Sequence, residues 1–222
     1  MLSPLQERVA ALVAGIEDAS GFALAGGAAL IIQGRISRKT RDLDFFGPAP
    51  AAVDRLLPLV EAELANEGLA VRRVMVNPGF ARLEIGDGRD QTELDLAADA
   101  RLLPVQPTTP APTLSGQELG ADKVLAIFSR AEARDFSDLV PLEEAYGLDQ
   151  LLELASRKDL GFQPKYFAEM LGRFDRFRRE EFDITDQQFA RLKESVARWH
   201  ERALERSRER GRDRGDGLDL GF

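Results

Sequence analysis

The sequence predicts an α+β protein, in which a mixed β-sheet with helices is followed by a C-terminal helical region. Short segments that alternate polar and apolar residues occur before residue 103, as in half-buried strands. Four prolines stiffen residues 104–113, and apolar residues recur at helical spacing beyond them. We therefore expect a core domain over 1–103, a helical domain over 114–205 and a charged, disordered tail over 206–222.

Composition restricts the class of protein. Of the 222 residues, 44% are hydrophobic and 31% are charged, which is typical of a soluble globular protein. The longest nearly apolar run, residues 22–32, is shorter than the roughly 20 residues of a membrane span. Glu7 and Arg8 interrupt the apolar stretch that a secretory signal needs, so we expect a cytoplasmic protein without a membrane partner. The absence of cysteine excludes thiol catalysis and thiolate metal sites.

Charge is distributed unevenly along the chain. Residues 1–156 contain 14 Lys+Arg and 24 Asp+Glu, whereas residues 157–215 contain 16 and 12. If the protein binds a polyanion, we therefore expect the C-terminal third to contact it. The alternation of Arg and Glu after Arg202 would also suit a solvated helix, and both interpretations stay open.

Local signals predict the elements of the N-terminal half. Ser3, Pro4 and Gln6 match a capping box with proline at the first helical position, so a helix is expected to begin there. Pro58 is expected to kink or restart a helix over 50–66. The other predicted elements are strands over 22–25, 42–46, 71–76, 80–85 and 91–97, the last two forming a hairpin, and a short helix over 28–33.

Helices are expected throughout the C-terminal half. Thr185 and Gln188 match a second capping box. Trp199 shares a helical spacing with Leu192 and Val196, so we expect it to anchor the last helix on the core. The predicted helices cover residues 116–134, 136–145, 148–156, 164–179 and 185–205.

Alternating carboxylates on two strands are the chemically distinctive feature. Asp42 and Asp44 are expected on one strand face, with Cα atoms about 6.6 Å apart. Glu93 and Asp95 alternate in the same way on the last strand. Three carboxylates on adjacent strands can hold two Mg²⁺ ions about 3.5 to 4 Å apart, and these ions clamp the attacking and leaving oxygens of phosphoryl transfer. We assign the third position to Asp95, with Glu93 as its rival.

A glycine turn and a basic loop precede the first carboxylate pair. Gly26 and Gly27 come directly before a short helix, and such a turn exposes backbone N–H groups to a phosphate. A simple packing turn would have the same composition. Arg38 and Lys39 lie in the loop before Asp42, where they are expected beside a bound triphosphate or in solvent.

Two segments carry a resemblance to a known family, residues 25–30 (AGGAAL) and residues 38–45 (RKTRDLDF). They resemble the leading motif of the nucleotidyl transferase AbiEii/AbiGii toxin family, within the DNA polymerase β-like nucleotidyltransferases. Lys123, Arg130 and residues 134–139 (RDFSDL) resemble the later lysine and Arg-Asp-x-x-Asp element of that family. The matched segments extend over roughly residues 22 to 140 and leave the last third uncovered.

The resemblance implies a nucleotidyltransferase-like core and a reaction that moves a nucleoside monophosphate from a nucleoside triphosphate to an acceptor hydroxyl. It also implies an RNA acceptor, such as tRNA, or a protein acceptor, Mg²⁺ as cofactor, and a separately encoded antitoxin. The superfamily often has serine where this chain has Gly27, so one hydroxyl contact to phosphate is lost. The residues that the resemblance implies are Asp42 and Asp44 as catalytic metal ligands, Gly26 and Gly27 as the phosphate turn, and Lys123 and Asp135 as later catalytic residues.

The residues of the later motif each fit more than one role. Lys123 is expected to meet phosphate oxygens or the charge that develops on leaving pyrophosphate. Lys123 and Arg130, seven residues apart, share a face if their segment is one helix, but a solvated face would look the same. Asp135 could equally cap the next helix.

The sequence does not support two other classes of enzyme. The chain has no Gly-x-x-x-x-Gly-Lys-Ser/Thr loop, and a serine–histidine–acid triad would have to use His200, beside a tryptophan in a charged helix. Two rivals stay open: transfer to a small molecule such as an aminoglycoside, and a binding or antitoxin-like module whose carboxylates have no catalytic role.

Overall fold

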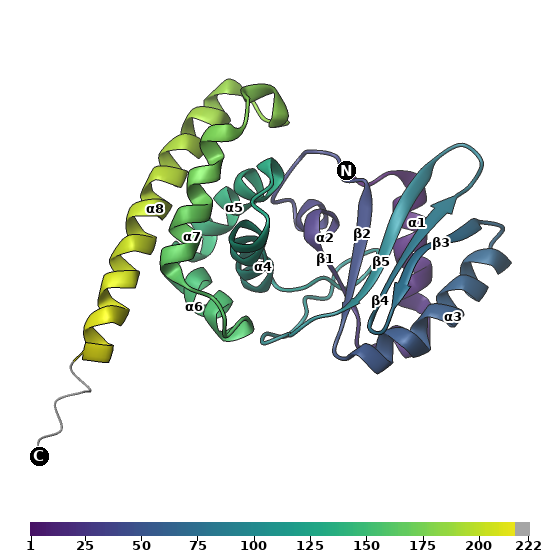
Figure 1. Ribbon diagram of the computed structural model, residues 1–222. Coiled ribbons are helices and arrows are strands. Elements are labelled where there is room, and N and C mark those ends of the chain that lie inside the picture. The colour runs from purple at the N-terminus through teal and green to yellow at the C-terminus, as the bar shows by residue number, and fades with distance from the viewer. Residues whose placement is uncertain (216–222) are drawn as a thin grey trace, which may run out of the picture. The chain divides into compact units, whose positions relative to one another are not determined.

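The computed structural model describes residues 1–215 and divides the chain into two compact units, residues 1–119 and 120–222 (Figure 1). The division falls inside one helix, later than the proline-rich stretch at which we predicted it. The reason is that this stretch is hydrogen-bonded to the first strand: the Leu24 N–H donates to the Pro112 carbonyl, and the Leu114 N–H donates to the Leu24 carbonyl, both at 2.8 Å.

The first unit contains a five-stranded sheet with helices. Its order is β1-β2-β5-β4-β3; β2 and β5 are parallel and the other neighbours are antiparallel. The predicted mixed sheet and the predicted hairpin of β4 and β5 are thereby confirmed. The elements of this unit are α1 (Pro4–Gly15), the 3₁₀ helix η1 (Glu17–Ala19), β1 (Ala23–Ala25), α2 (Gly26–Ile32), β2 (Asp42–Gly47), α3 (Pro50–Asn66), β3 (Ala70–Asn77), β4 (Phe80–Gly86) and β5 (Gln91–Ala98).

Helices α1 and α3 cover one face of the sheet (Figure 1). Strand residues that point toward them, such as Leu43 and Leu94, are fully buried. The capping box at Ser3 and Gln6 forms as predicted, with the Gln6 N–H donating to Ser3 Oγ at 3.2 Å. Helix α3 continues through Pro58 without the predicted restart.

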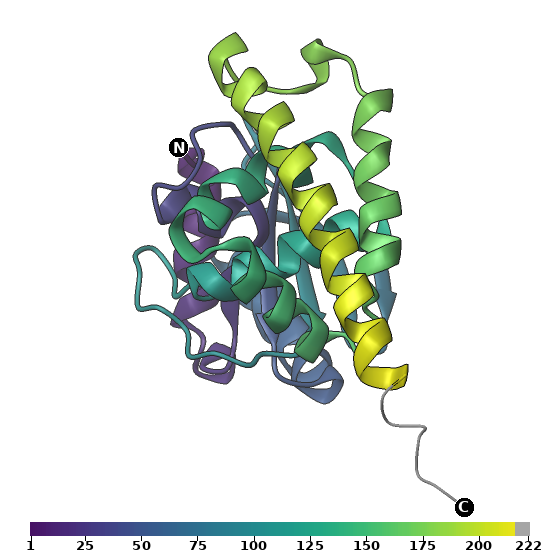
Figure 2. The ribbon, with the colours of Figure 1, turned by 90° about the vertical axis from the view of Figure 1, so that its left-hand side faces the viewer.

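The second unit is helical, as predicted. Helices α7 and α8 lie side by side (Figure 2). Trp199 on α8 is fully buried together with Leu192, which confirms its anchoring role. The elements, beginning with the helix that spans the division, are α4 (Gly116–Ser129), α5 (Ala133–Tyr146), α6 (Leu148–Lys158), α7 (Pro164–Leu171), the 3₁₀ helices η2 (Gly172–Arg176) and η3 (Arg179–Glu181), and α8 (Asp186–Gly215).

Helix ends in the second unit differ from those predicted. Helix α4 ends five residues early because Ala131 adopts a positive φ of 53°, which breaks the helix. Helix α7 passes into 3₁₀ turns after Leu171. Helix α8 extends beyond Glu205 to Gly215; the ion pair of Arg206 with Asp149 ties its later turns to α6. The remainder of the predicted tail, 216–222, lies outside the described residues. Within the described chain, no helix has the length and apolar character of a membrane span.

Candidate active site

Strands β2 and β5 carry four carboxylates on the sheet face opposite α1 and α3. In the parallel register Asp42 lies beside Glu93, and Asp44 lies beside Asp95. Directly paired residues of neighbouring strands share a face, and the intervening Leu43 and Leu94 point into the core. We call Asp42, Asp44, Glu93 and Asp95 the carboxylate face. The sequence predicted each alternation correctly, and the register brings the two pairs together.

Hydrogen bonds position the start of β2, from which Asp42 projects. The Thr40 hydroxyl donates to Asp42 Oδ1 at 2.7 Å. Gln6 Nε2 on α1 donates to the Thr40 carbonyl at 3.1 Å and to Thr92 Oγ1 at 3.3 Å. Thr92 Oγ1 donates in turn to the Arg41 carbonyl at 3.0 Å. This network ties α1, β2 and β5 together beside the carboxylate face.

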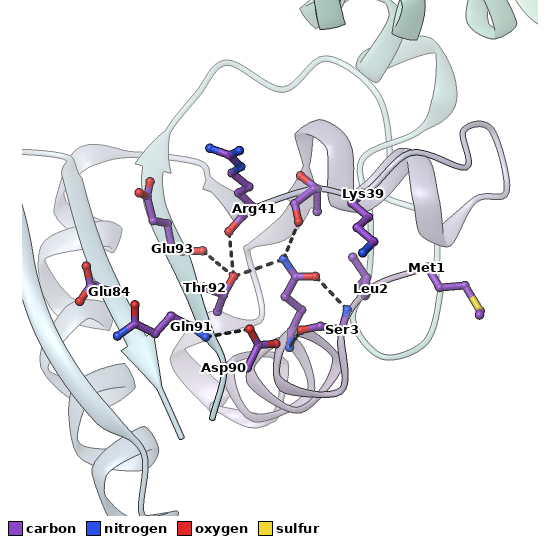
Figure 3. A pocket seen from close by; sticks show the side chains of 12 residues that line it. Met1, Leu2, Ser3, Lys39, Arg41, Glu84, Asp90, Gln91, Thr92 and Glu93 are labelled. Atoms are coloured by element: carbon purple, nitrogen blue, oxygen red, sulfur yellow. Dashed lines mark hydrogen bonds between the residues drawn. The ribbon is translucent and has the colours of Figure 1, made fainter. Parts of the chain in front are cut away.

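A pocket of about 570 Å³ lies along this network (Figure 3). Its lining includes Lys39 and Arg41 from the basic loop and Glu93 from the carboxylate face. In Figure 3, the side chains of Arg41 and Glu93 project from neighbouring strand starts. Lys39 and Glu93 therefore line one pocket, whose lining does not include the other three members of the carboxylate face, and its volume is in the range of small-molecule sites.

The glycine turn packs directly against the carboxylates. Gly26 has φ of +58°, and a Cβ added there would lie 2.0 Å from Asp44 Oδ2. A Cβ at Gly27 would lie 2.9 Å from Thr40 Oγ1 and 3.1 Å from Arg38 Nη2. Gly26 is thus required sterically, whereas a side chain at Gly27 would have to displace the ends of the Thr40 and Arg38 side chains. The structure brings together the turn, Arg38 and the first carboxylate pair, as the sequence predicted.

Substitution of Gly26 by alanine is expected to lower stability and to disturb the carboxylate face together. The methyl group would collide with the Asp44 carboxylate and would hold an L residue at positive φ. The backbone strain alone costs about 1 to 2 kcal/mol. Thermal unfolding would measure the loss of stability, and the activity of the site would measure the second effect.

Gly34→Ala is the matched control for that substitution. Gly34 also has positive φ, +67°, but a Cβ there would meet no atom within 4 Å. This variant should show the loss of stability caused by strain and leave the activity of the site unchanged. Equal activity in Gly26→Ala and Gly34→Ala would show that contact between the turn and Asp44 is unimportant for catalysis.

Asp95, the predicted third carboxylate, forms an ion pair with an arginine. Arg82 on β4 donates from Nε to Asp95 Oδ1 at 2.7 Å and from Nη2 to Asp95 Oδ2 at 2.6 Å. Among the described residues, no group of three His, Cys, Asp or Glu side chains is arranged to hold a metal ion. The assignment of Asp95 as third ligand therefore stays a prediction. Arg82 was not among the predicted site residues, although its alternation with Glu84 on β4 was a signal for the shared face.

A buried ion network occupies the second unit. Lys123 Nζ on α4 lies 2.8 Å from Asp138 Oδ2 and 3.4 Å from Asp135 Oδ1, both on α5. Arg130 Nε, on the turn after α4, lies 3.1 Å from Asp135 Oδ2. Lys123 and Arg130 thus both contact Asp135, although Arg130 lies beyond the end of the helix on which the two were expected to share a face. The side chain of Asp135 is fully buried and that of Lys123 is 8% exposed, so the solvated-face alternative is wrong for Lys123.

Asp135 also has the capping role that we considered. Its Oδ2 accepts a hydrogen bond from the Glu132 N–H at 3.3 Å, which completes a capping box at the start of α5. The structure therefore shows Lys123 and Asp135 in contact within the second unit. Asp138 is a further member of the network that the site prediction left out, although it belongs to the RDFSDL segment.

This chain is similar to one protein family and to solved structures of other proteins. The model of the family described as nucleotidyl transferase AbiEii toxin, type IV toxin–antitoxin system, matches residues 11–212. The structure of JHP933 from Helicobacter pylori aligns with a TM-score of 0.55 and 19% identity, covering 99% of this chain and all of that one. An H. pylori protein provisionally assigned as a nucleotidyltransferase aligns with a TM-score of 0.59 and 19% identity, covering 92% and 94%. No curated protein sequence matches this chain significantly.

Proposed function

Since this chain belongs to the AbiEii family of nucleotidyl transferase toxins, from type IV toxin–antitoxin systems, we propose that it is an Mg²⁺-dependent enzyme that transfers a nucleoside monophosphate from a nucleoside triphosphate to a hydroxyl of RNA or protein. The main support is the contact of the glycine turn with the carboxylate face, at the place where Gly26 approaches Asp44. A phosphate-binding turn and metal-binding carboxylates must be adjacent for this reaction.

The first carboxylate pair has suitable chemistry for Mg²⁺, which prefers carboxylate oxygens and retains several waters. Asp42 and Asp44 project from one face and are only half-buried, so they are accessible to a hydrated ion. They would hold Mg²⁺, and Asp95 would join them once Arg82 is displaced. When bound, the divalent ions favour ionisation of the acceptor hydroxyl and neutralise charge on the triphosphate.

The other residues of the first unit would orient the substrate. Thr40 holds the Asp42 carboxylate through its 2.7 Å hydrogen bond. Arg38, beside Gly27, and Lys39 would contact phosphate oxygens together with backbone N–H groups of the turn. The acceptor oxygen then bonds to the α-phosphorus, the bond to the bridging oxygen breaks, and pyrophosphate leaves.

Lys123 and Asp135 are proposed as later active-site residues because they match the family motif. Their mutual ion pair fixes the ammonium of Lys123 within the second unit.

Label transfer would test the function directly. The purified chain would be incubated with Mg²⁺, total cellular RNA and each of the four α-labelled nucleoside triphosphates in turn. Label in RNA from one or more nucleotides, with release of pyrophosphate, is the expected result. Label in protein would identify a protein acceptor, label in a small molecule would favour the antibiotic-type rival, and no label in any fraction would contradict the proposal.

A further inference from the structure

Arg82 is positioned as a built-in cation on the carboxylate face. Its guanidinium binds both oxygens of Asp95, and its Nε lies 3.6 Å from Glu93 Oε2. The pairing is a bidentate fork, the strongest arrangement available to an arginine and a carboxylate. The side chain of Asp95 is 9% exposed, so the guanidinium covers most of the access to that carboxylate.

The charge balance of the face explains why an arginine lies there. The β2–β5 register places Asp44 beside Asp95 and Asp42 beside Glu93, and four carboxylates this close repel one another. Hydrogen bonding to Asp95 raises the pKa of Arg82 above its usual value, with smaller contributions from the charges of Asp95, Glu93 and Asp42. Arg82 therefore stays cationic and offsets this repulsion.

On the basis of the proposed function, we propose that Arg82 and a divalent ion compete for Asp95. A metal ion that binds Asp95 must use the two carboxylate oxygens to which the guanidinium donates, and two cations this close repel each other, so they compete. The side chain of Arg82 is 39% exposed and has room to swing away. Arg82 binds Asp95 in the ion-free protein and releases it when the ion binds. Because this ion pair must first be broken, the ion binds more weakly than it would to a carboxylate face without the arginine.

Metal titration of Arg82→Gln tests this competition without measuring catalysis. Thermal unfolding would be followed as Mg²⁺ is added at constant ionic strength and without nucleotide. Because the variant has no guanidinium to displace, its titration midpoint should fall below that of the wild type by up to about fivefold, the factor that corresponds to an ion pair worth about 1 kcal/mol. Without Mg²⁺ the variant should unfold at a lower temperature than the wild type.

Two further variants make the result specific. Arg72→Gln is the matched control: Arg72 pairs with Glu84 one strand farther from the carboxylate face, so its removal should leave the midpoint unchanged. Arg82→Lys keeps the charge without the fork and should shift the midpoint in the same direction by less. It also serves as the test should the glutamine variant fail to fold.

The outcomes separate this proposal from the proposed function. Equal midpoints in the wild type and the Arg82 variants, with stabilisation that Asp44→Asn removes, would overturn the competition and leave the metal site standing. Weaker metal binding in the Arg82 variants would also overturn it. No saturable stabilisation by Mg²⁺ in any of these proteins would overturn both proposals.

Discussion

Asp44→Asn is expected to abolish nucleotidyl transfer and to leave the fold intact. The asparagine fills the same space against Gly26, but it is neutral and a poorer ligand for Mg²⁺ than a carboxylate. The loss should be at least about 10³-fold, because a bound metal ion contributes several kcal/mol to stabilising the transition state. The transfer assay and thermal unfolding, performed on the same preparation, would measure both properties.

Stability should not fall in this variant. Asp44 lies beside Asp95 on the carboxylate face, so removal of its charge relieves repulsion. Glu61→Gln is the control, since Glu61 lies on α3, which covers the opposite face of the sheet, and pairs with Arg73; its transfer rate should stay close to that of the wild type. Full activity in Asp44→Asn would refute the metal role.

Lys123→Met is expected to destabilise the second unit by about 3 to 5 kcal/mol. The substitution leaves the carboxylates of Asp135 and Asp138 buried without the ammonium, and removal of one partner from a buried ion pair costs about this much. Trp199 is the single tryptophan and lies buried in the second unit. Its fluorescence during urea denaturation would therefore report the unfolding of that unit specifically.

Arg134→Gln is the control for the buried network. Arg134 Nε lies 2.9 Å from Glu132 Oε2, and both side chains are more than two-fifths exposed (41% and 49%), so its loss should cost less than about 1 kcal/mol. A Lys123→Met protein as stable as the wild type would show that the ammonium does not support the fold. Transfer activity measured without urea would then report its role toward substrate alone.

Local sequence signals predicted much of the fold correctly. The capping boxes at Ser3 and Thr185 form, because each needs only residues within one helical turn. The two pairs of carboxylates alternate as predicted, because the side chains of a strand alternate by its own geometry. The predicted ends of α4 and α7 were wrong: no glycine or proline follows Ser129 directly, and the signal of Gly172 directly after Leu171 was not used.

Local sequence signals also predicted part of the candidate site. The residues of the glycine turn and of the first carboxylate pair were identified from their types and spacing, and the structure brings Gly26 and Asp44 together. The partner of Asp95 was not identified. Its discovery required the register of the β4–β5 hairpin, which places Arg82 opposite Asp95.

The amino-acid sequence by itself determined the α+β class, the alternation of the carboxylates and the family motif, since each depends on residues close together in the chain. Only the tertiary structure decided which cation each carboxylate binds. Asp95 pairs with Arg82, and Asp135 with Lys123 and Arg130, although many basic residues were available as partners. Charge attraction is not directional over long distances, whereas the strand register and the packing of α4 against α5 select one partner for each carboxylate.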